Sequence, residues 1–134
     1  MSNVLSTLVG RRVLALRISG DCHILSISTN QGDVNVLAFG DCCSEAWFAD
    51  MTGVAALVGG IVQEIAEVIH DTPVEDGRTR QDVDSVYGYK IRTDRGHADL
   101  IFRNSSNGYY SGELGPFEED LPEDMRPITK DWSA

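Results

Sequence analysis

The sequence has few basic residues and no long apolar run, and these two absences exclude several classes of protein. Its formal net charge is −10 over 134 residues, with 11 Lys and Arg against 21 Asp and Glu. DNA and RNA binding draws its affinity from basic side chains that meet phosphates, so we expect no nucleic-acid partner. No stretch reaches the roughly 18 apolar residues of a membrane span, and the first residues do not resemble a secretory signal. We therefore expect a cytoplasmic protein without a membrane partner.

Cysteine is also scarce, and its spacing fits neither a disulfide framework nor a metal site. The three cysteines are Cys22, Cys42 and Cys43. Adjacent cysteines rarely bridge each other without strain, and zinc sites usually space their cysteines by two or more residues. Ligands from Cys22 and His23 therefore do not make a convincing zinc site, and buried thiols are the favoured interpretation for at least one of the adjacent pair. No histidine sits in a recognisable nucleophile motif, so we predict no metal, no cofactor and no enzymatic activity.

The negative charge is concentrated near the C-terminal end. Residues 113–134 hold seven acids and two bases, which gives −5 of the total −10. Together with three prolines, this composition predicts an acidic tail of residues 113–134 that wraps the preceding domain or stays loose. Phe117 and Trp132 could anchor it. Residues 1–112 are then predicted to form a ligand-binding domain, whose bases are almost all arginine and could hold a small anion.

Alternating and β-branched runs predict a mainly antiparallel sheet. Three runs separated by short polar turns are typical of a meander, namely Arg12–Ile18, Ile24–Ser28 and Val34–Phe39. The segment Glu45–Met51 could extend that sheet. Thr52 is a plausible N-cap for a short helix over residues 53–58, with Gly59-Gly60 as the stop.

The second half of the chain predicts further strands. The segment Ile61–Ile69 has apolar positions that fit a helix or a strand, and the preceding Gly-Gly pair favours a strand. A long exposed loop over residues 70–85 precedes a hairpin of Val86–Arg92 and Ala98–Phe102 around the turn Thr93–Gly96, and Tyr109–Gly112 could add a last short strand. The predicted fold class is α+β, mainly antiparallel β-sheet with one short helix and an acidic C-terminal tail.

The most informative segment for function directly follows the predicted strand that ends at Phe102. Arg103 offers a guanidinium that can bind a phosphate bidentately, and hydroxyls and backbone N–H groups can complete an anion site. Amides suited to a purine edge and aromatic rings suited to stacking follow within a few residues. The candidate residues of this segment are Arg103, Asn104, Ser105, Ser106, Asn107, Tyr109 and Tyr110. The alternative interpretation is a polar turn in which Asn107-Gly108 makes a hairpin and the tyrosines complete the core.

Several of these motifs resemble the Thoeris anti-defence protein 1 family of phages. The resemblance runs from about Leu8 to Gly112, in order and with similar spacing. It rests on Asp41–Ser44, Trp47–Asp50, Val86–Lys90 and above all Arg103–Tyr110, with a further likeness at Thr129–Ser133. Ser111 stands where the family pattern leads us to expect glycine, a minor departure.

The resemblance implies that the protein is a phage sponge against bacterial immunity. Family members bind glycocyclic ADP-ribose isomers made by TIR-domain enzymes and withhold them from the Thoeris effector without cleaving them. They assemble as homo-oligomers, either dimers or hexamers, and some hexamers also take cyclic di- or trinucleotides of the CBASS system at a separate site. Both ligand classes and both assemblies are therefore expectations for this chain.

The chemistry of the ligand assigns a role to each candidate residue. Arg103 would neutralise the pyrophosphate, and Asn104 or Asn107 would read the adenine edge. The adenine would stack on Tyr87, Tyr109 or Trp47, and Asp41 or Asp94 would accept hydrogen bonds from ribose hydroxyls. Arg78 and Arg80, in the predicted loop, could close over an anion. Two alternatives remain open: a small phosphodiesterase or hydrolase that uses Asp and His, and a protein-binding inhibitor whose acidic tail mimics nucleic acid.

Overall fold

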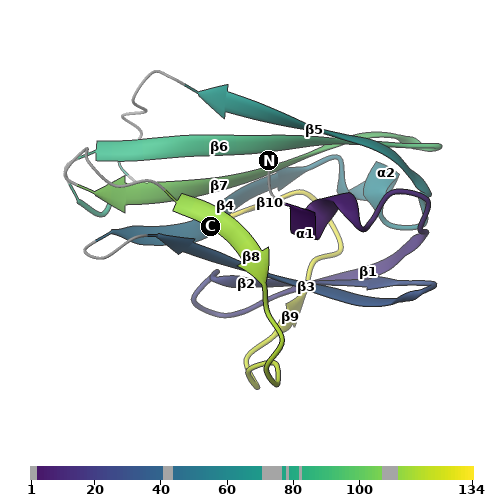
Figure 1. The fold of residues 1–134 in the computed structure, drawn as a ribbon, viewed down its shortest axis with the longest axis horizontal. Helices are drawn as coiled ribbons and strands as arrows, with labels where there is room; N and C mark the ends of the chain where they lie inside the picture. The colour runs from purple at the N-terminus through teal and green to yellow at the C-terminus, as the bar shows by residue number, and fades with distance from the viewer. Residues whose placement is uncertain (1–2, 41–43, 71–76, 78, 82, 107–111) are drawn as a thin grey trace.

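The computed structural model describes residues 3–40, 44–70, 77, 79–81, 83–106 and 112–134. Within these residues the chain forms two four-residue helices and ten strands (Figure 1). In chain order they are α1 (Asn3–Ser6), β1 (Val13–Ile18), β2 (Ile24–Thr29), β3 (Gly32–Gly40), β4 (Glu45–Thr52), α2 (Val54–Leu57), β5 (Val62–His70), β6 (Val83–Thr93), β7 (Gly96–Ser106), β8 (Gly112–Pro116), β9 (Arg126–Pro127) and β10 (Trp132–Ser133).

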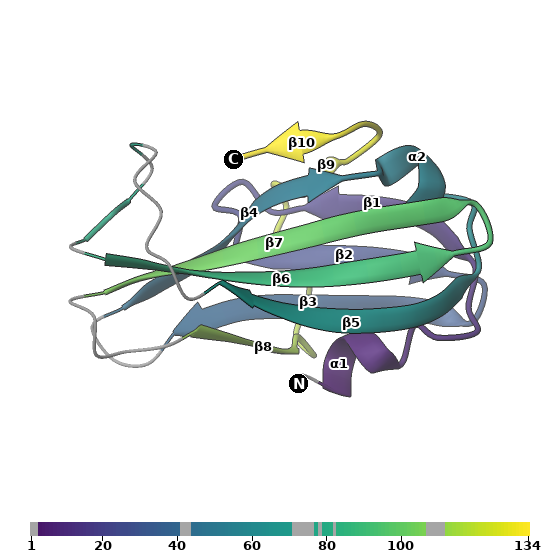
Figure 2. The same cartoon turned by 90° about the horizontal axis from the view of Figure 1, so that it is seen from above.

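The strands form two five-stranded sheets that pack face to face, as Figures 1 and 2 show. The strand order is β8-β3-β2-β1-β9 in the first sheet and β10-β4-β7-β6-β5 in the second, and every pairing is antiparallel. The predicted class, mainly antiparallel sheet with little helix, is confirmed. The arrangement is a sandwich, in which each sheet contributes one face to a shared core.

The predicted meander is confirmed as β1, β2 and β3 of the first sheet. The segment from Glu45 also forms a strand, but it does not extend that sheet. Strand β4 instead enters the second sheet between β10 and β7. The crossing is held by the backbone, because the Phe48 N–H donates a 2.8 Å hydrogen bond to the Cys22 carbonyl in the turn between β1 and β2.

The short helix after β4 is confirmed, but its cap differs from the predicted one. Thr52 is the last residue of β4, and the N-cap is Gly53 in the left-handed region with φ 74°. A β-carbon there would lie 2.8 Å from the Ala98 Cα, so glycine is needed for space as well as for φ. The first helical N–H, at Val54, donates to the carboxylate of Asp131 over 3.1 Å. A residue 77 positions away therefore supplies the cap that Thr52 was expected to supply.

The hairpin of β6 and β7 is longer than the sequence predicts. Its register runs from Thr93↔Gly96 at the turn to Val83↔Ser106 at the open end. Strand β7 thus continues through Arg103, Asn104, Ser105 and Ser106, where a polar segment after the strand was expected. The preference for a strand over residues 61–69 is confirmed, since β5 pairs with β6 along most of its length.

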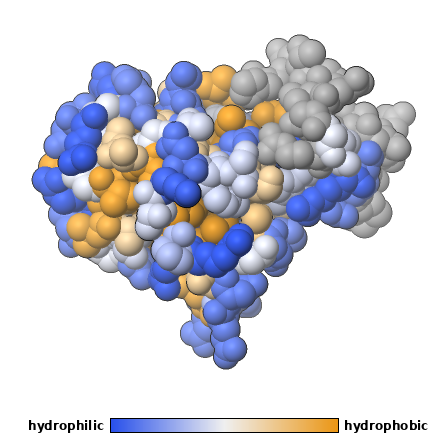
Figure 3. Space-filling model, turned by 180° about the vertical axis from the view of Figure 1, so that it is seen from behind, coloured by the Kyte–Doolittle hydropathy of each residue, from blue (hydrophilic) through white to orange (hydrophobic). Residues whose placement is uncertain are grey.

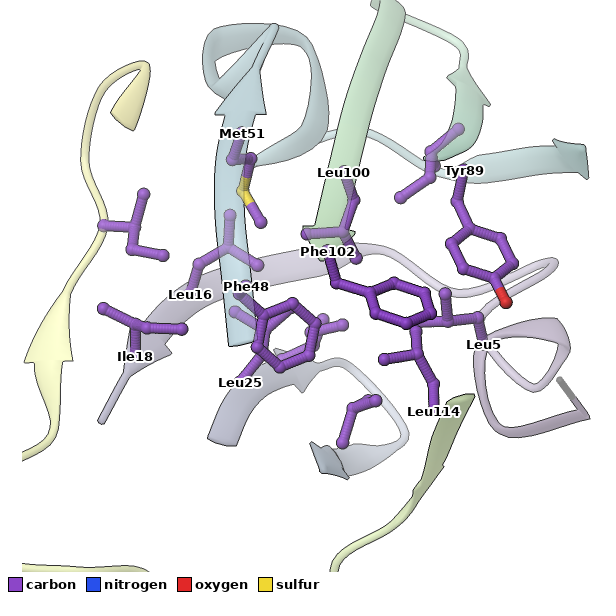
Figure 4. Close-up of a cluster of buried hydrophobic side chains, with 14 of the residues drawn as sticks. Leu5, Leu16, Ile18, Leu25, Phe48, Met51, Tyr89, Leu100, Phe102 and Leu114 are labelled. Carbon is purple, nitrogen blue, oxygen red and sulfur yellow. The ribbon is translucent and has the colours of Figure 1, made fainter. Parts of the chain in front are cut away.

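The core lies between the sheets and is aromatic at its centre. Figure 4 shows Phe48 of β4 and Phe102 of β7 directed toward Leu16 and Leu25 of the first sheet. All four side chains are buried. Burial of one such side chain contributes about 1.5–3 kcal/mol relative to exposure, so this layer holds the two sheets together.

The segment after residue 112 wraps the preceding domain and does not stay loose, which was the other predicted alternative. Strand β8 pairs with β3, β9 with β1, and β10 with β4, so the segment contacts both sheets. The Phe117 N–H donates to the Asn35 carbonyl, and Trp132 packs against the core cluster, as predicted for anchors. Among the described residues there is no helix long and apolar enough to cross a membrane.

Candidate functional site

Four consecutive polar residues are buried at the open end of β7. They are Arg103, Asn104, Ser105 and Ser106, and none is more than 1% exposed. Polar groups of this kind are costly to bury unless partners satisfy them, most of all the guanidinium. Strand geometry places alternate residues on opposite faces, so the row divides into two pairs.

Arg103 and Ser105 lie on the outer face of the second sheet, away from the first sheet. Arg103 pairs across the ladder with Trp47, whose neighbour Phe48 points into the core. The Arg103 guanidinium carbon lies 6.0 Å from the centroid of the Trp47 ring, and that of Arg80 lies 4.0 Å from it. The indole therefore contacts two guanidinium groups, an arrangement that the ring quadrupole favours.

Arg80 is fixed above this face by three contacts. Its backbone N–H donates a 3.0 Å hydrogen bond to the Ser105 hydroxyl, and its guanidinium is 3.5 Å from the Glu45 carboxylate. Both side chains of that ion pair are well exposed, so solvent screens it and it contributes little to stability. We call Trp47, Arg80, Arg103 and Ser105 the arginine cluster. It combines two positive charges and a hydroxyl, which can bind a phosphate, with an aromatic ring, which can stack on a base.

Asn104 lies on the inner face, between the two sheets. It faces two glycines of the first sheet, Gly40 at the end of β3 and Gly112 at the start of β8. A β-carbon on Gly112 would lie 2.9 Å from the Asn104 Cβ, and one on Gly40 would overlap the Asn104 carbonyl oxygen. Gly40 and Gly112 are themselves a pair in the ladder of β3 and β8. The close approach of the amide to this end of the first sheet thus depends on two residues without side chains.

A small polar cavity of about 250 Å³ lies on the same inner face. Tyr87 and Phe102 line it and stack with ring centroids 4.7 Å apart. The Tyr87 hydroxyl accepts a 3.2 Å hydrogen bond from the Gly112 N–H. The charged residues of the lining are both acidic, Glu67 and Glu113. This cavity suits hydroxyl groups better than phosphates.

The predicted candidates therefore do not meet in one pocket. Strand β7 separates Arg103, Ser105 and Trp47 on one face from Asn104, Ser106 and Tyr87 on the other. The prediction treated them as one binding surface because it expected an irregular segment after Phe102. Within a regular strand, neighbouring side chains point in opposite directions.

Asp94 lies far from both groups. It belongs to the turn of the β6–β7 hairpin, nine residues of strand from Arg103, which is about 30 Å at roughly 3.3 Å per residue. Its carboxylate accepts a 2.8 Å hydrogen bond from the Ile61 N–H. A role at the same site as Arg103 is therefore wrong for this residue. The predicted candidates Asp41, Asn107, Tyr109 and Tyr110 lie outside the described residues.

A turn between β1 and β2 brings together the side-chain types that a hydrolase uses. The Ser19 hydroxyl donates a 2.6 Å hydrogen bond to the Asp21 carboxylate, which also accepts one from the backbone N–H of His23. Burial alone would raise the pKa of Asp21, but these hydrogen bonds and the positive charge of His23 lower it overall. The Ser19 oxygen is itself occupied by the Ile24 N–H at 2.9 Å. These contacts stabilise the turn, and the contact that His23 makes with Asp21 uses its backbone rather than its ring.

Two further predictions concern cysteine and metal. Cys22 is buried in this turn, with φ 62°, and burial raises the pKa of its thiol. A thiol of this kind is a poor nucleophile because little of it is ionised at neutral pH. Within the described part of the chain, no group of three or more His, Cys, Asp or Glu side chains is placed to hold a metal ion. Cys42 and Cys43 lie outside that part.

Sequence reasoning partly missed Arg80 and wholly missed Glu45. Arg80 was noted as a residue that could close over an anion, without any indication that it would stack on Trp47. Both residues lie far from Arg103 in sequence, and no local periodicity connects them. The cross-strand pair of Glu45 and Ser105 would indicate the connection once β4 is placed beside β7.

Comparison with known proteins assigns a family. A family model described as "Domain of unknown function (DUF7448)" matches residues 6–114, so the chain belongs to that family. The "Uncharacterized protein L278" of Acanthamoeba polyphaga mimivirus is 35% identical over 82 residues. The match covers 59% of this chain and 64% of that viral protein, so it spans less than two thirds of the relative. No solved structure matches the chain.

Proposed function

We propose that this member of the DUF7448 family is a phage anti-defence sponge that binds glycocyclic ADP-ribose and sequesters it without cleavage. It would act in the cytoplasm of an infected bacterial cell, where it would withhold the signal from the Thoeris effector. The proposal rests on one observation above all. The Arg103 guanidinium is buried beside Trp47, and a second guanidinium, that of Arg80, lies over the same ring.

The burial of Arg103 places a positive charge away from water, where its attraction to an anionic ligand would be strong. Removal of a guanidinium from water costs several kcal/mol even after the protein relaxes, and an apolar side chain of similar volume would pack more cheaply. A pyrophosphate would be held firmly by two guanidinium groups, because charge-assisted bidentate hydrogen bonds are among the strongest that side chains make.

The proposal has a further requirement, which is tight binding rather than turnover. A sponge must hold its ligand with a dissociation constant of about 1 nM, equivalent to about −12 kcal/mol. Such affinity calls for water to be excluded from the charged contacts, which the burial of Arg103 and Ser105 favours. Glu45, half-exposed beside Arg80, can accept hydrogen bonds from ribose hydroxyls.

The proposed function is tested by capture and release. The purified protein is mixed with excess synthetic glycocyclic ADP-ribose, separated from free ligand, heated, and the released molecules are identified by mass spectrometry. We expect the intact cyclic compound in stoichiometric amount. Recovery of a linear product would instead support a hydrolase, and a ligand that does not stay with the protein would overturn the proposal.

The Arg103→Met variant links capture to the arginine cluster. Methionine approximates the volume of the stem and removes the charge, so the variant should fold and lose the ligand. The matched control is Arg92→Met, because Arg92 belongs to the same hairpin and is exposed in an ion pair with Glu64. Equal capture by both variants would exclude the arginine cluster as the site.

The alternative of an acidic inhibitor needs a test that leaves the fold intact. Deletion of residues 113–134 would remove most of β8, which pairs with β3 and carries the buried Leu114. Substitution is cleaner, since Glu118, Glu119 and Asp120 are all exposed. A variant with amides at these three positions should capture the ligand as the wild type does. Loss of inhibition of the defence system, with capture unchanged, would support the tail as the active part.

A further inference from the structure

A second cavity, of about 370 Å³, opens on the side of the sandwich where β1 and β4 are not paired with each other. Figure 3 views this side, and apolar surface gathers over its left part, which corresponds to the region of α2 and β1. Strand β1, helix α2, the hairpin turn and the segment after β9 each contribute to the wall. The lining residues are Leu14, Ala15, Leu16, Val54, Ala55, Val58, Arg95, Pro127, Ile128 and Thr129.

The lining is apolar with a single charged residue. Except for Arg95 and Thr129, every lining residue has an aliphatic side chain. Leu14 is 53% exposed, the largest value among the exposed large hydrophobic residues of the described chain. Apolar walls with a few well-placed polar groups are typical of small-molecule sites, and the volume lies within their usual range of about 300–1,000 Å³. The cavity would thus accept an alkyl or aryl group.

Arg95 lines this cavity, and Arg12 lies next to it in the structure, because both side chains approach Gly59. Arg12 donates a 2.5 Å hydrogen bond to the Gly59 carbonyl, and a β-carbon on Gly59 would lie 3.7 Å from a terminal nitrogen of Arg95. Arg95 is also held by a 3.3 Å hydrogen bond from its Nε to the Ala55 carbonyl. These hydrogen bonds already fix the side chains of both arginines, so less conformational entropy is lost when an anion binds.

The acidic residues near the cavity accept hydrogen bonds from backbone N–H groups. Asp94, next to Arg95 in sequence, accepts from the Ile61 N–H, and Asp131 accepts from the Val54 N–H. Among the described residues, no carboxylate forms an ion pair with Arg12 or Arg95. Arg95 therefore keeps a positive charge that no ion pair with a described residue compensates, and this charge favours an external anion.

The cavity wall is preformed by the C-terminal segment. Ile128 is buried, and its N–H donates a 2.8 Å hydrogen bond to the Leu16 carbonyl. This contact holds the segment across the gap between β1 and α2. The wall therefore does not have to be ordered when a ligand arrives, and this further lowers the cost of binding.

We propose that this cavity binds a small amphipathic anion, with an alkyl or aryl group against Leu14, Val58 and Ile128 and a carboxylate at Arg95. The site is separate from the arginine cluster, which lies at the opposite end of β7. The two sites use different chemistry, because the arginine cluster buries its charge and this cavity buries apolar surface. The inference does not depend on the proposed function.

The test uses decanoate and decanol, which share an alkyl chain and differ in charge. Each is titrated into the full-length ¹⁵N-labelled protein below its micelle concentration, and the amide signals of residues 54–58 and 128 are followed by NMR. Decanoate should bind at least about tenfold more tightly than decanol, because a charge-assisted hydrogen bond contributes about 1.5–3 kcal/mol. Equal binding of the two compounds would overturn the proposal.

Two variants locate the site. Arg95→Gln should lower decanoate affinity to the level of decanol and leave decanol binding unchanged, whereas the control Arg92→Gln should alter neither. Ala55→Trp places an indole over the cavity from an exposed helical position and should abolish binding of both compounds. Light scattering on the same samples tests a different occupant. If the wild type is an oligomer that excludes decanoate and Ala55→Trp dissociates it, the cavity is an interface between copies and the proposal is wrong.

Discussion

At the turn of the β6–β7 hairpin, polar side chains serve the backbone, whereas at its open end four of them lie buried in a row. At the turn, Thr93 donates to the Ala56 carbonyl over 2.7 Å and accepts from the Arg95 N–H over 3.0 Å. Asp94 accepts from Ile61 in the same region. At the open end, Arg103 and its three successors are buried on both faces of the strand.

The difference separates two reasons for burying polar groups. The hydrogen bonds of Thr93 and Asp94 join β6, α2 and the segment before β5. Their role is therefore to stabilise the fold. The guanidinium of Arg103 instead lies near the aromatic ring of Trp47, and burial of a charge there costs more than burial of an apolar side chain. We therefore expect substitutions at the turn to change stability alone, and substitutions at the open end to divide their effects between stability and ligand binding.

The largest effect should come from Trp47→Ala. Trp47 is the ring that both Arg80 and Arg103 contact, and it is almost fully buried. Truncation of a buried tryptophan costs about 3–5 kcal/mol in free energy of unfolding, and the loss of the ring should also abolish ligand capture. Urea unfolding followed by circular dichroism measures the first quantity. Trp47→Phe keeps an aromatic face and should retain part of both properties; equal losses in the two variants would mean that the ring face does not matter.

The next effect separates stability from binding at Arg103. Arg103→Ala should weaken glycocyclic ADP-ribose binding by about 2–3 kcal/mol, the usual cost of a lost charge-assisted contact. Arg103→Met should weaken it similarly while leaving the free energy of unfolding unchanged or higher, because a buried charge is replaced by an apolar chain. Calorimetry and urea unfolding report the two quantities. If Arg103→Met binds normally but unfolds more easily, the guanidinium is structural and the contrast between the two ends disappears.

Much of the architecture could be predicted because strands with one buried face alternate in sequence. The run Arg12–Ile18 and the two that follow it have this period, and β1, β2 and β3 form there. The end of β7 could not be found in this way. Polar residues are mostly exposed, so Arg103–Ser106 looked like an irregular segment, and only their placement between β4 and β6 makes them a buried strand.

The same limit applies to the caps and to the site. Thr52 has good N-cap chemistry, but the cap of α2 is formed by Gly53 and by Asp131 from the far end of the chain. No local pattern indicates a contact over that separation. Asp94 differs, since the predicted hairpin turn already placed it at the opposite end of β7 from Arg103. That inference was available from the sequence and would have removed Asp94 from the candidates.

A smaller effect is expected at the turn end. Thr93→Val keeps the shape of a buried side chain and removes the hydroxyl hydrogen bonds with the Ala56 carbonyl, the Gly96 carbonyl and the Arg95 N–H. The free energy of unfolding should fall by about 1–3 kcal/mol, with ligand capture unchanged. The control is Thr52→Val, where the side chain is exposed and the change should be close to zero. A loss of ligand capture in Thr93→Val would mean that the two ends are coupled.

The smallest effect concerns Asp21, an exposed residue of the β1–β2 turn. The carbonyl of Cys22 in the same turn accepts a hydrogen bond from the Phe48 N–H of β4. The pKa of Asp21 lies below the ordinary value of 3.8, because hydrogen bonds from Ser19 and His23 outweigh the opposing effect of burial. A carboxylate with a lowered pKa stabilises the fold at every pH above its ordinary pKa. That contribution is lost as the pH falls through the lowered pKa. The wild type should therefore be more stable than Asp21→Asn near neutral pH, and the difference in free energy of unfolding should shrink below about pH 4. Urea unfolding over a pH series measures it. If the difference in free energy of unfolding grew on acidification, the carboxylate of Asp21 would not be the group that stabilises this turn.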